Sequence, residues 1–332
     1  MKYLIGTMLG WMLPVCFVSA AQAADIYVDA RNGGKENGTI TAPYRTIGAA
    51  VKAASSGDRI QIAAGNYAEN LHLKKPLTLQ GGFVGAQAQT YAAGGSGDFS
   101  RSEPSKQESV INGNAEAPVI LAEGTIETTL DGLVLRGGKS GVESSAYPED
   151  KARLTLRHCR VEQNGNPSVI GGGIRAKSEL LVEDSIVRDN VGDRGSGIAS
   201  GPARAIIART AIQANTSHGD HGGGLYAAGP VDVVGCLVVD NTVGKTAGYG
   251  WGGGLMFFNE GTKATVTDTE VRGNFAPTKG SGVFVDDGAE ASLRNVLIVN
   301  NRCAKEGGAL YVDGATEQLG SKAWLTNVTI AG

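Results

Sequence analysis

Apolar and polar residues follow a repeating pattern through the second half of the chain. An asparagine recurs every 25 to 33 residues, with one aliphatic residue three positions before it and another eight positions before it. The six asparagines are Asn164, Asn190, Asn215, Asn241, Asn274 and Asn301. Six copies in one register indicate a solenoid built from repeated coils.

The spacing within each repeat predicts strands. Apolar residues lie two positions apart, as in Leu154 and Leu156 or in Cys159 and Val161, which is typical of a strand with one buried face. The step from Leu156 to Cys159 is three positions, so the chain must bend between the two strands. A glycine-rich element follows each asparagine and precedes a third short strand, such as the one over 225–227. We therefore predict three strands and three turns per coil.

Identical positions of successive coils align only if the coils stack at ~4.8 Å, the spacing between neighbouring strands. This arrangement is an all-β fold, the parallel β-helix. Helical repeats are excluded, because no apolar stripe with i, i+3, i+4 spacing runs through the unit. Stacked asparagines would hydrogen-bond from coil to coil, and glycines fit corners that need a positive φ. We interpret both columns as structural.

The first hundred residues predict a cap for the stack. A strand over 26–28 precedes an amphipathic helix over 46–55, which would cover the open edge of the first coil. Further strands are expected over 59–62, 70–73 and 77–79, and irregular early coils over 110–135. Residues 86–108 are rich in Gly, Ser, Ala and Gln, and we expect a surface loop there. The alignment of repeats places Gly138 at the asparagine position of an early coil.

Composition and charge narrow the class of protein. The 332 residues include 50 glycines, about twice the usual share of ~7%, but they lack the Gly-X-Y period of collagen. With 41% hydrophobic residues the chain is not disordered. The formal net charge of −3 produces no field that would recruit nucleic acid, so we expect no nucleic-acid partner.

The N-terminus predicts a signal peptide over residues 1–23. Its apolar run over 3–18 is too short for a comfortable membrane span, and Ala21-Gln22-Ala23 has the small-x-small form that signal peptidase needs. Cleavage after Ala23 is expected, with Ala20 as the alternative. The mature chain then has no transmembrane segment. We expect it to be exported: secreted, periplasmic or located at the cell surface.

The rest of the chain divides into the cap with the first coils, over 24–100, and the parallel β-helix, over 101–332. Residues 323–332 align with 291–300, so the sequence stops one residue before the next asparagine position. We expect a fragment truncated within the β-helix. Cys159 and Cys236 share one repeat position three coils apart, roughly 14 Å, which exceeds the ~7 Å limit for a disulfide. No bridge is expected between them.

Several motifs carry a family resemblance. The N-terminal ones are Ile26-Tyr27-Val28-Asp29, Asn37-Gly38-Thr39, Pro43-Tyr44-Arg45-Thr46-Ile47, Gly57-Asp58-Arg59-Ile60 and Gly65-Asn66-Tyr67. They resemble the cap of the pectate-lyase-like right-handed β-helix superfamily. Val161-x-x-Asn164 followed by Gly171-Gly172-Gly173-Ile174 resembles the repeats of chlamydial polymorphic outer membrane proteins, although Val or Ile replaces their Phe. The resemblance implies a right-handed coil and no particular activity, because this fold carries lyases, hydrolases, epimerases, adhesins and inert stalks.

Candidate binding residues lie in the segments between each asparagine and the following glycines, which should all emerge on one side of the stack. Loops on a rigid solenoid concentrate binding residues. The candidates for substrate binding are Arg194, Tyr249, Trp251, Lys279 and Arg302. Aromatic rings stack on sugars, and cations, among them Lys245 and His221 near Trp251, favour acidic sugars. A solvated rim with locally packed aromatic residues is the alternative.

His218-Gly219-Asp220-His221 is the local cluster with catalytic residue types. An Asp beside two His could orient an imidazole base, or hold a metal with a further ligand from a neighbouring coil. The catalytic candidates are His218, Asp220, His221 and Lys245. Structural or solvent-exposed histidines are the alternative. The NTD, GHG and RIK motifs of polygalacturonases and the DPHD motif of mannuronan epimerases are missing.

Asp286 and Asp313 fall at matching outward positions on adjacent coils. Two carboxylates ~5 Å apart repel each other unless they are paired or bridged by a cation. We name this pair as the candidate metal site, with calcium as the candidate ion. Screening by water or a nearby lysine is the alternative, and no cofactor is expected to be required.

Two functions remain open. The leading hypothesis is an exported or cell-surface β-helix that recognises a polysaccharide or a surface protein, as an adhesin-like module. The alternative is a polysaccharide-active enzyme, a lyase or hydrolase that acts on acidic polysaccharide. The residues alone do not decide whether the protein is an enzyme.

Overall fold

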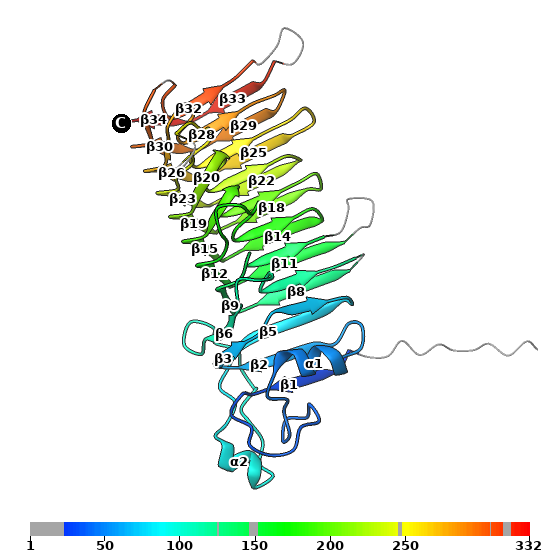
Figure 1. The fold of residues 1–332 in the computed structure, drawn as a ribbon. Coiled ribbons are helices and arrows are strands. Elements are labelled where there is room, and N and C mark those ends of the chain that lie inside the picture. The colour runs from blue at the N-terminus through cyan, green and yellow to red at the C-terminus, as the bar shows by residue number, and fades with distance from the viewer. Residues whose placement is uncertain (1–22, 125, 146–151, 245–247, 306, 315–319) are drawn as a thin grey trace, which may run out of the picture.

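The computed structural model describes residues 23–124, 126–145, 152–244, 248–305, 307–314 and 320–332. Over these residues the chain forms an elongated right-handed parallel β-helix, with α1 (Ile47–Ala53) near one end and the C-terminus at the other (Figure 1). The predicted fold class is confirmed. Residues 1–22, which hold nearly all of the predicted signal peptide, lie outside the described residues, as does Lys245. No helix in the described ranges is long and apolar enough to cross a bilayer.

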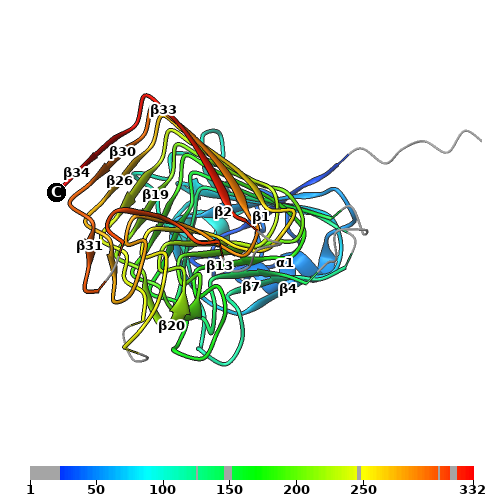
Figure 2. The ribbon, with the colours of Figure 1, turned by 90° about the horizontal axis from the view of Figure 1, so that it is seen from above.

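Three parallel sheets of the described residues run along the stack, and a full coil contributes one strand to each (Figures 1 and 2). The first sheet contains, in order, β1 (Asp25–Val28), β2 (Arg59–Ala63), β5 (Leu77–Phe83), β8 (Glu127–Asp131), β11 (Arg153–Arg157), β14 (Glu179–Glu183), β18 (Ala205–Ala208), β22 (Val231–Val234), β25 (Lys263–Thr267), β29 (Glu290–Arg294) and β33 (Lys322–Thr326). The second sheet contains β3 (Gly65–Ala68), β6 (Ser109–Asn112), β9 (Leu133–Arg136), β12 (Arg160–Glu162), β15 (Ile186–Arg188), β19 (Ala211–Gln213), β23 (Leu237–Val239), β26 (Glu270–Arg272), β30 (Leu297–Val299) and β34 (Thr329–Ala331). The third sheet contains β4 (Leu71–Leu73), β7 (Ile120–Ala122), β10 (Val142–Ser144), β13 (Ile174–Ala176), β17 (Ile198–Ser200), β21 (Leu225–Ala227), β24 (Leu255–Phe257), β28 (Val283–Val285) and β32 (Leu310–Val312).

The core consists of columns of aliphatic side chains that the repeat pattern predicted. The residues eight positions before each ladder asparagine are fully buried in the first sheet: Leu156, Val182, Ile207, Val233, Val266 and Leu293. Those three positions before it are fully buried in the second sheet: Val161, Val187, Ile212, Val238, Val271 and Ile298. Burying each such side chain contributes about 1.5–3 kcal/mol, so the columns hold the coils in register.

Left-handed residues turn the chain after the first and second strands of a coil and again before the third. In a middle coil these residues are Asp184 (φ 49°), Asp189 (φ 55°) and Gly195 (φ 53°). The sequence predicted a bend after the first strand and a positive φ at the glycine, but it assigned no left-handed residue to the first two positions. Arg209 and Ala214 occupy those positions in the next coil, although a left-handed backbone costs an ordinary residue roughly 1–2 kcal/mol.

The predicted asparagine ladder is confirmed. Each Nδ2 donates to the Oδ1 of the next asparagine at 2.9–3.1 Å. That Oδ1 also accepts the backbone N–H of the preceding asparagine, so one side chain satisfies polar groups on two coils. Gly138 donates its N–H to Asn164 Oδ1 at 3.0 Å, which confirms that it occupies the ladder position of an earlier coil.

The cap helix α1 begins after Thr46, whose Oγ1 accepts the N–H of Ala49 at 3.3 Å. The Glu69 carboxylate accepts the N–H groups of Ile47 and Gly48 at 2.8 and 2.7 Å, which satisfies two more donors of the first turn. The helix packs against β1, β2 and β4. It therefore lies over the first coil, as predicted, within shorter bounds than the expected 46–55.

The segment over 86–108 was expected to be a surface loop, and this prediction is wrong in part. It contains α2 (Ala88–Ala92), and Tyr91 and Phe99 within it are buried. The buried carboxylate of Asp29 accepts the Tyr91 hydroxyl and the Ala86 N–H, both at 2.9 Å, and it also pairs with Arg31 at 2.9 Å. These bonds anchor the segment to the end of β1.

None of the cysteines of the described residues, Cys159, Cys236 and Cys303, forms a disulfide, as expected for the first two. Burial raises the pKa of the Cys159 thiol to about 12. Cys159 and Cys236 lie at the first corner, where their thiols donate to backbone carbonyls at 3.3–3.4 Å. They serve as small buried side chains rather than as reactive groups.

Candidate functional site

The segments between the asparagines and the glycines stack on one another beside the third sheet. Two of them pair as β16 (Val191–Arg194) with β20 (Thr216–His221), and two others pair as β27 (Phe275–Ala276) with β31 (Arg302–Cys303). Viewed along the stack, β20 and β31 lie outside the outline of the coils, at the corner between the second and third sheets (Figure 2). The predicted common side for these segments is confirmed. Their pairing makes them a rigid platform.

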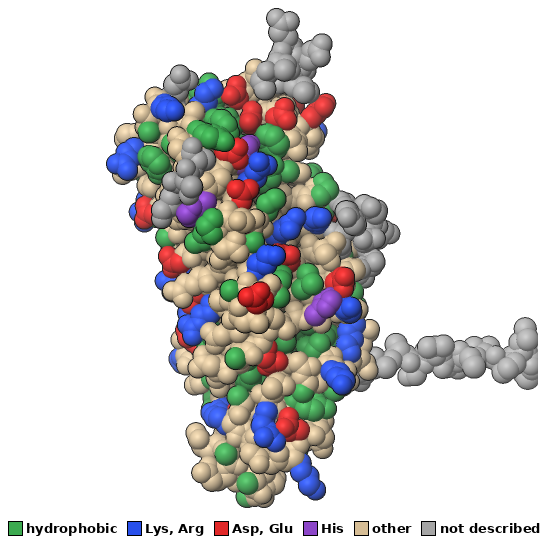
Figure 3. Space-filling view, in the orientation of Figure 1, with side chains coloured by type: hydrophobic (Ala, Val, Ile, Leu, Met, Phe, Trp, Pro, Cys, Tyr) green, Lys and Arg blue, Asp and Glu red, His purple; other side chains and the backbone are tan. Residues whose placement is uncertain are grey.

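A shallow groove of about 440 Å³ opens on this platform. Its described lining residues come from four consecutive coils: Pro167, Asp193, Arg194, His218, Gly219, Asp220 and Tyr249. We call this feature the loop groove. Figure 3 shows that hydrophobic, acidic and basic side chains are intermingled on the surface toward the C-terminal end of the stack.

The backbone fixes the polar residues of the loop groove. The N–H of Asp193 donates to the Val169 carbonyl at 2.6 Å, and its own carbonyl accepts the hydroxyl of Ser217. The Trp251 N–H donates to the Asp220 carbonyl at 2.8 Å, which ties the next coil to this one. Each polar side chain therefore extends from a backbone that is bonded to a neighbouring coil.

Arg194 lies between two carboxylates. Its Nε is 3.4 Å from Asp220 Oδ1 and 3.7 Å from Asp193 Oδ2. The same Asp220 oxygen is in hydrogen-bonding contact with His221 Nδ1. Arg194 and Asp193 are each about two-fifths exposed, whereas the His221 ring is only 13% exposed. The arrangement offers acceptors and donors to a ligand and orients one imidazole.

Aromatic rings surround His221. The centroid of its ring lies 5.3 Å from that of Trp251, 5.4 Å from that of Phe258 and 6.1 Å from that of Tyr226. Trp251 also supports Tyr249, with ring centroids 5.8 Å apart and planes at 60°. Tyr249 is 48% exposed, while Trp251 is half-buried. Tyr249 therefore presents an accessible ring, and Trp251 packs against it.

The remaining sequence candidates lie on later coils. Lys279 follows Trp251 in the stack, and its Nζ is 3.4 Å from Asp313 Oδ2 and 4.6 Å from the centre of the Tyr311 ring. Arg302 lies on β31 over the ring of Phe275, at 5.3 Å. The structure thus brings together Arg194, His218, Asp220, His221, Tyr249 and Trp251, and places Lys279 next to them and Arg302 apart.

The acidic pair has the expected register, because Val285 and Val312 are paired directly before Asp286 and Asp313. Burial raises the pKa of Asp286, and the negative charges of Asp313 and Asp287 raise it further. Among the described residues no group of three or more His, Cys, Asp or Glu side chains is arranged to hold a metal ion. Calcium at this pair stays a prediction.

Sequence reasoning missed Tyr226 and Phe258. Tyr226 is the outward residue of β21, between the buried Leu225 and Ala227, so strand alternation could have identified it. Phe258 directly follows the buried Phe257 and reaches His221 from the next coil. That contact crosses coils, so no local pattern in the sequence indicates it.

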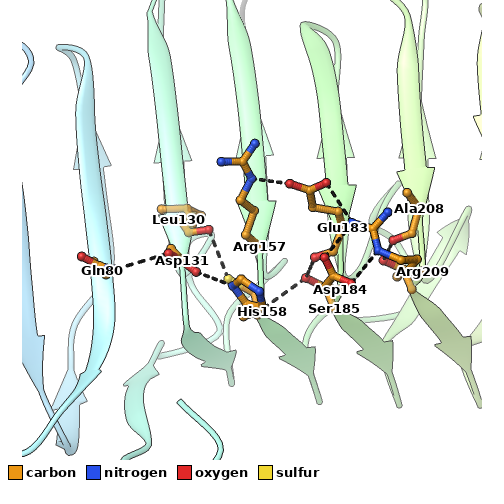
Figure 4. Close-up of polar contacts among 12 residues, drawn as sticks. Gln80, Leu130, Asp131, Arg157, His158, Glu183, Asp184, Ser185, Ala208 and Arg209 are labelled. Carbon is orange, nitrogen blue, oxygen red and sulfur yellow. Dashed lines mark hydrogen bonds and ion pairs between the residues drawn. The ribbon is translucent and has the colours of Figure 1, made fainter. Parts of the chain in front are cut away.

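A second polar array lies at a different corner, between the first and second sheets (Figure 4). His158 Nδ1 contacts Asp131 Oδ1 at 2.8 Å, and Arg209 pairs with Asp184 at 2.7 Å and with Glu183 at 3.2 Å. The hydrogen bond from Arg209 lowers the pKa of the Asp184 carboxyl. These exposed side chains pair from coil to coil along the stack, so we assign the array to stability rather than to binding.

The chain was compared with known proteins. The model of a family described as a protein of unknown function, DUF1565, matches residues 31–179. A search of curated proteins found no match. A crystal structure of pectate lyase Pel9A is similar with 11% identity and a TM-score of 0.46, over 88% of this chain and 79% of that one. The pectin methylesterase from Aspergillus niger, in deglycosylated form, is similar with 13% identity and a TM-score of 0.37, over 94% of this chain and 87% of that one.

Proposed function

We propose that this protein is an exported β-helix that recognises a glycan in the loop groove. The observation that carries the proposal is the exposed Tyr249 ring, which Trp251 supports beside the polar pair of Arg194 and Asp193. Sugars present flat C–H faces and projecting hydroxyls. A fixed aromatic ring packs against the C–H face, and nearby planar polar groups hydrogen-bond to the hydroxyls. Export is inferred from the N-terminal sequence, and attachment of the glycan to a cell surface would make the protein an adhesin-like module.

The loop groove suits binding because its walls are already formed. Ordering a flexible loop on binding costs conformational entropy and lowers the affinity. The stacked, hydrogen-bonded coils have already lost this entropy on folding. The volume of about 440 Å³ falls within the range of about 300–1,000 Å³ that small-molecule sites occupy. The groove is open along the platform, so a chain of sugars could extend across several coils.

Glycan-array and cell-adhesion binding test the proposal. The purified chain should bind a defined set of glycans, and Tyr249→Ala should lower the affinity at least tenfold without changing the melting temperature, because Tyr249 is half exposed. Tyr249→Phe should retain most of the binding, since the ring face remains. A folded protein that binds neither glycans nor cells would contradict the proposal. Binding to cells without binding to glycans would favour a surface protein as the partner.

The His221–Asp220 contact supports a second candidate function, a polysaccharide lyase or hydrolase. Asp220 orients the imidazole through Nδ1, which is how a carboxylate prepares a histidine base. Incubation with pectate, alginate and glycosaminoglycans, with and without calcium, would reveal lyase activity as the ultraviolet absorbance of unsaturated uronates, and new reducing ends would reveal hydrolysis. Activity that His221→Ala abolishes would favour the enzyme hypothesis, and an absence of products would contradict it.

A further inference from the structure

We infer that the loop groove selects neutral, hydroxyl-rich sugars over uronic acids. This inference rests on the proposed function of the same groove. The sequence alone favours acidic sugars, because it contains cations near aromatic residues. The structure shows how the cation of the groove is used. Arg194 lies within 3.4 Å of Asp220 and within 3.7 Å of Asp193, so two carboxylates already share its charge.

The charge balance of the described lining residues opposes an anionic ligand. Asp193 and Asp220 contribute two negative charges and Arg194 contributes one positive charge. A sugar carboxylate that approached the other donors of the guanidinium would still lie close to both acids. Like charges at such distances repel, and partial burial strengthens the repulsion. A hydroxyl carries no such cost.

The same groups suit a neutral sugar. Each carboxylate has about four acceptor sites. Asp220 uses one of them in its contact with His221, whereas the ion-pair contacts of Arg194 Nε are not hydrogen bonds, and the remaining sites can accept hydroxyl donors. The guanidinium has five donors in a fixed plane and reaches hydroxyl oxygens with the groups that do not face the acids. Hydrogen bonds with a charged partner are about twice as strong as neutral ones.

Gly219 adds a geometric requirement. A Cβ at this position would lie 2.3 Å from Asp193 Oδ1 and 2.5 Å from the Asp193 carbonyl oxygen. The absence of a side chain therefore lets the Asp193 carboxylate lie against the backbone of the next coil. This position brings it to the same Arg194 that Asp220 contacts. The two acids and the aromatic ring of Tyr249 then line one groove.

Calorimetric titration with matched tetrasaccharides tests the inference. β-1,4-Galactotetraose, cellotetraose and mannotetraose serve as neutral probes, and tetragalacturonate and tetraguluronate serve as acidic probes. At least one neutral probe should bind tenfold or more tightly than either acidic probe. Its Kd should change less than twofold between 50 and 500 mM salt, because no ion pair with the ligand forms. Over this range the Debye length shortens roughly threefold, from ~14 to ~4 Å, so an ion pair would weaken visibly.

Asp193→Asn tests whether the Asp193 carboxylate determines the preference for neutral sugars, as distinct from an effect on folding. It should weaken neutral binding at least fivefold and reduce the preference over the acidic probes, because a charged acceptor is lost. Asp240→Asn is the matched control, since Asp240 is an exposed carboxylate outside the lining of the loop groove, with φ 55°, which asparagine tolerates. Tighter binding of an acidic probe, or a preference that Asp193→Asn leaves unchanged, would overturn the inference and keep the glycan function. Binding of no saccharide by folded protein would refute both.

Discussion

The asparagine ladder makes a quantitative prediction about the position of a substitution in the stack. Removal of the Asn215 side chain by Asn215→Ala leaves three buried groups without their partner: the N–H and one Nδ2 hydrogen of Asn190, and the carbonyl of Val187. Asn241 Oδ1 keeps the N–H of residue 215 and stays satisfied.

Asn164 provides the comparison, because a glycine precedes it in the ladder. Asn164→Ala strands the N–H of Gly138 and the carbonyl of Leu135, and no amide side chain lies on the earlier coil to lose a bond. It also removes the contact from Nδ2 to the Glu162 carbonyl at 2.9 Å, but two Nδ2 hydrogens serve three acceptors there, so this contact is weaker than a full hydrogen bond. Each fully stranded buried group costs about 1–3 kcal/mol, and the lost Glu162 contact offsets part of the difference. Asn215→Ala should therefore destabilise the protein by about 1 kcal/mol more than Asn164→Ala does.

Thermal melting followed by circular dichroism measures the difference, which should amount to a few degrees in a chain of this size (about 1–3 °C for each kcal/mol). Gln213→Ala is the control, because Gln213 lies on the outer face of the same coil as Asn215 and is only partly buried. It should change the melting temperature little. Equal melting temperatures for the two ladder variants, or a larger loss at Asn164, would refute the reasoning.

Three further predictions follow from the corners and the third sheet. Ala214→Gly should stabilise the protein by up to about 1 kcal/mol in chemical denaturation, because Ala214 is exposed with φ 54°, whereas Ala211→Gly on the adjacent strand should destabilise it. Asp286→Asn should raise the melting temperature at pH 7, because the raised pKa of Asp286 means that its ionisation costs stability in the folded state. This cost is absent below the ordinary pKa of about 3.9, grows as the pH rises from there toward the raised pKa, and is complete above it. The gain should therefore vanish near pH 4, and a gain that persists there would contradict the assignment, with Asp240→Asn at an exposed carboxylate as the control. Trp251→Ala should lower the free energy of unfolding by about 2 kcal/mol, because its ring is half-buried, whereas a core aromatic residue would cost ~3–5 kcal/mol. An unchanged melting temperature would contradict a packing role for the ring.

The coil was predictable from the sequence because its determinants recur at fixed spacing. The aliphatic columns and the asparagine ladder depend on residue type alone, so six copies made their register visible. The left-handed residues after the first and second strands were not predictable in the same way. His158, Arg209 and Ala214 adopt left-handed backbones because the stacked coils impose the bend, and their side chains carry no signal for it.

The candidate site was only partly predictable, since its contacts cross coils. The sequence named Arg194 and Asp220 individually, but their pairing depends on an irregularity in β16 and β20. Gly192 is paired with Ser217, whereas Arg194 is paired with His221, so β20 contains two additional residues at this point. That shift brings Asp220 near Arg194. Likewise, the burial of Tyr91 depends on a hydrogen bond to Asp29, 62 residues away in the chain.

A crystal structure of the protein with its tightest-binding oligosaccharide tests the central claim most directly. The account predicts one sugar ring against the exposed face of Tyr249, with its hydroxyls within hydrogen-bonding distance of Asp193 and Arg194. The backbone of the loop groove should shift little on binding, because neighbouring coils already hold it. An oligosaccharide bound to another face of the stack, with no sugar in the loop groove, would contradict the account.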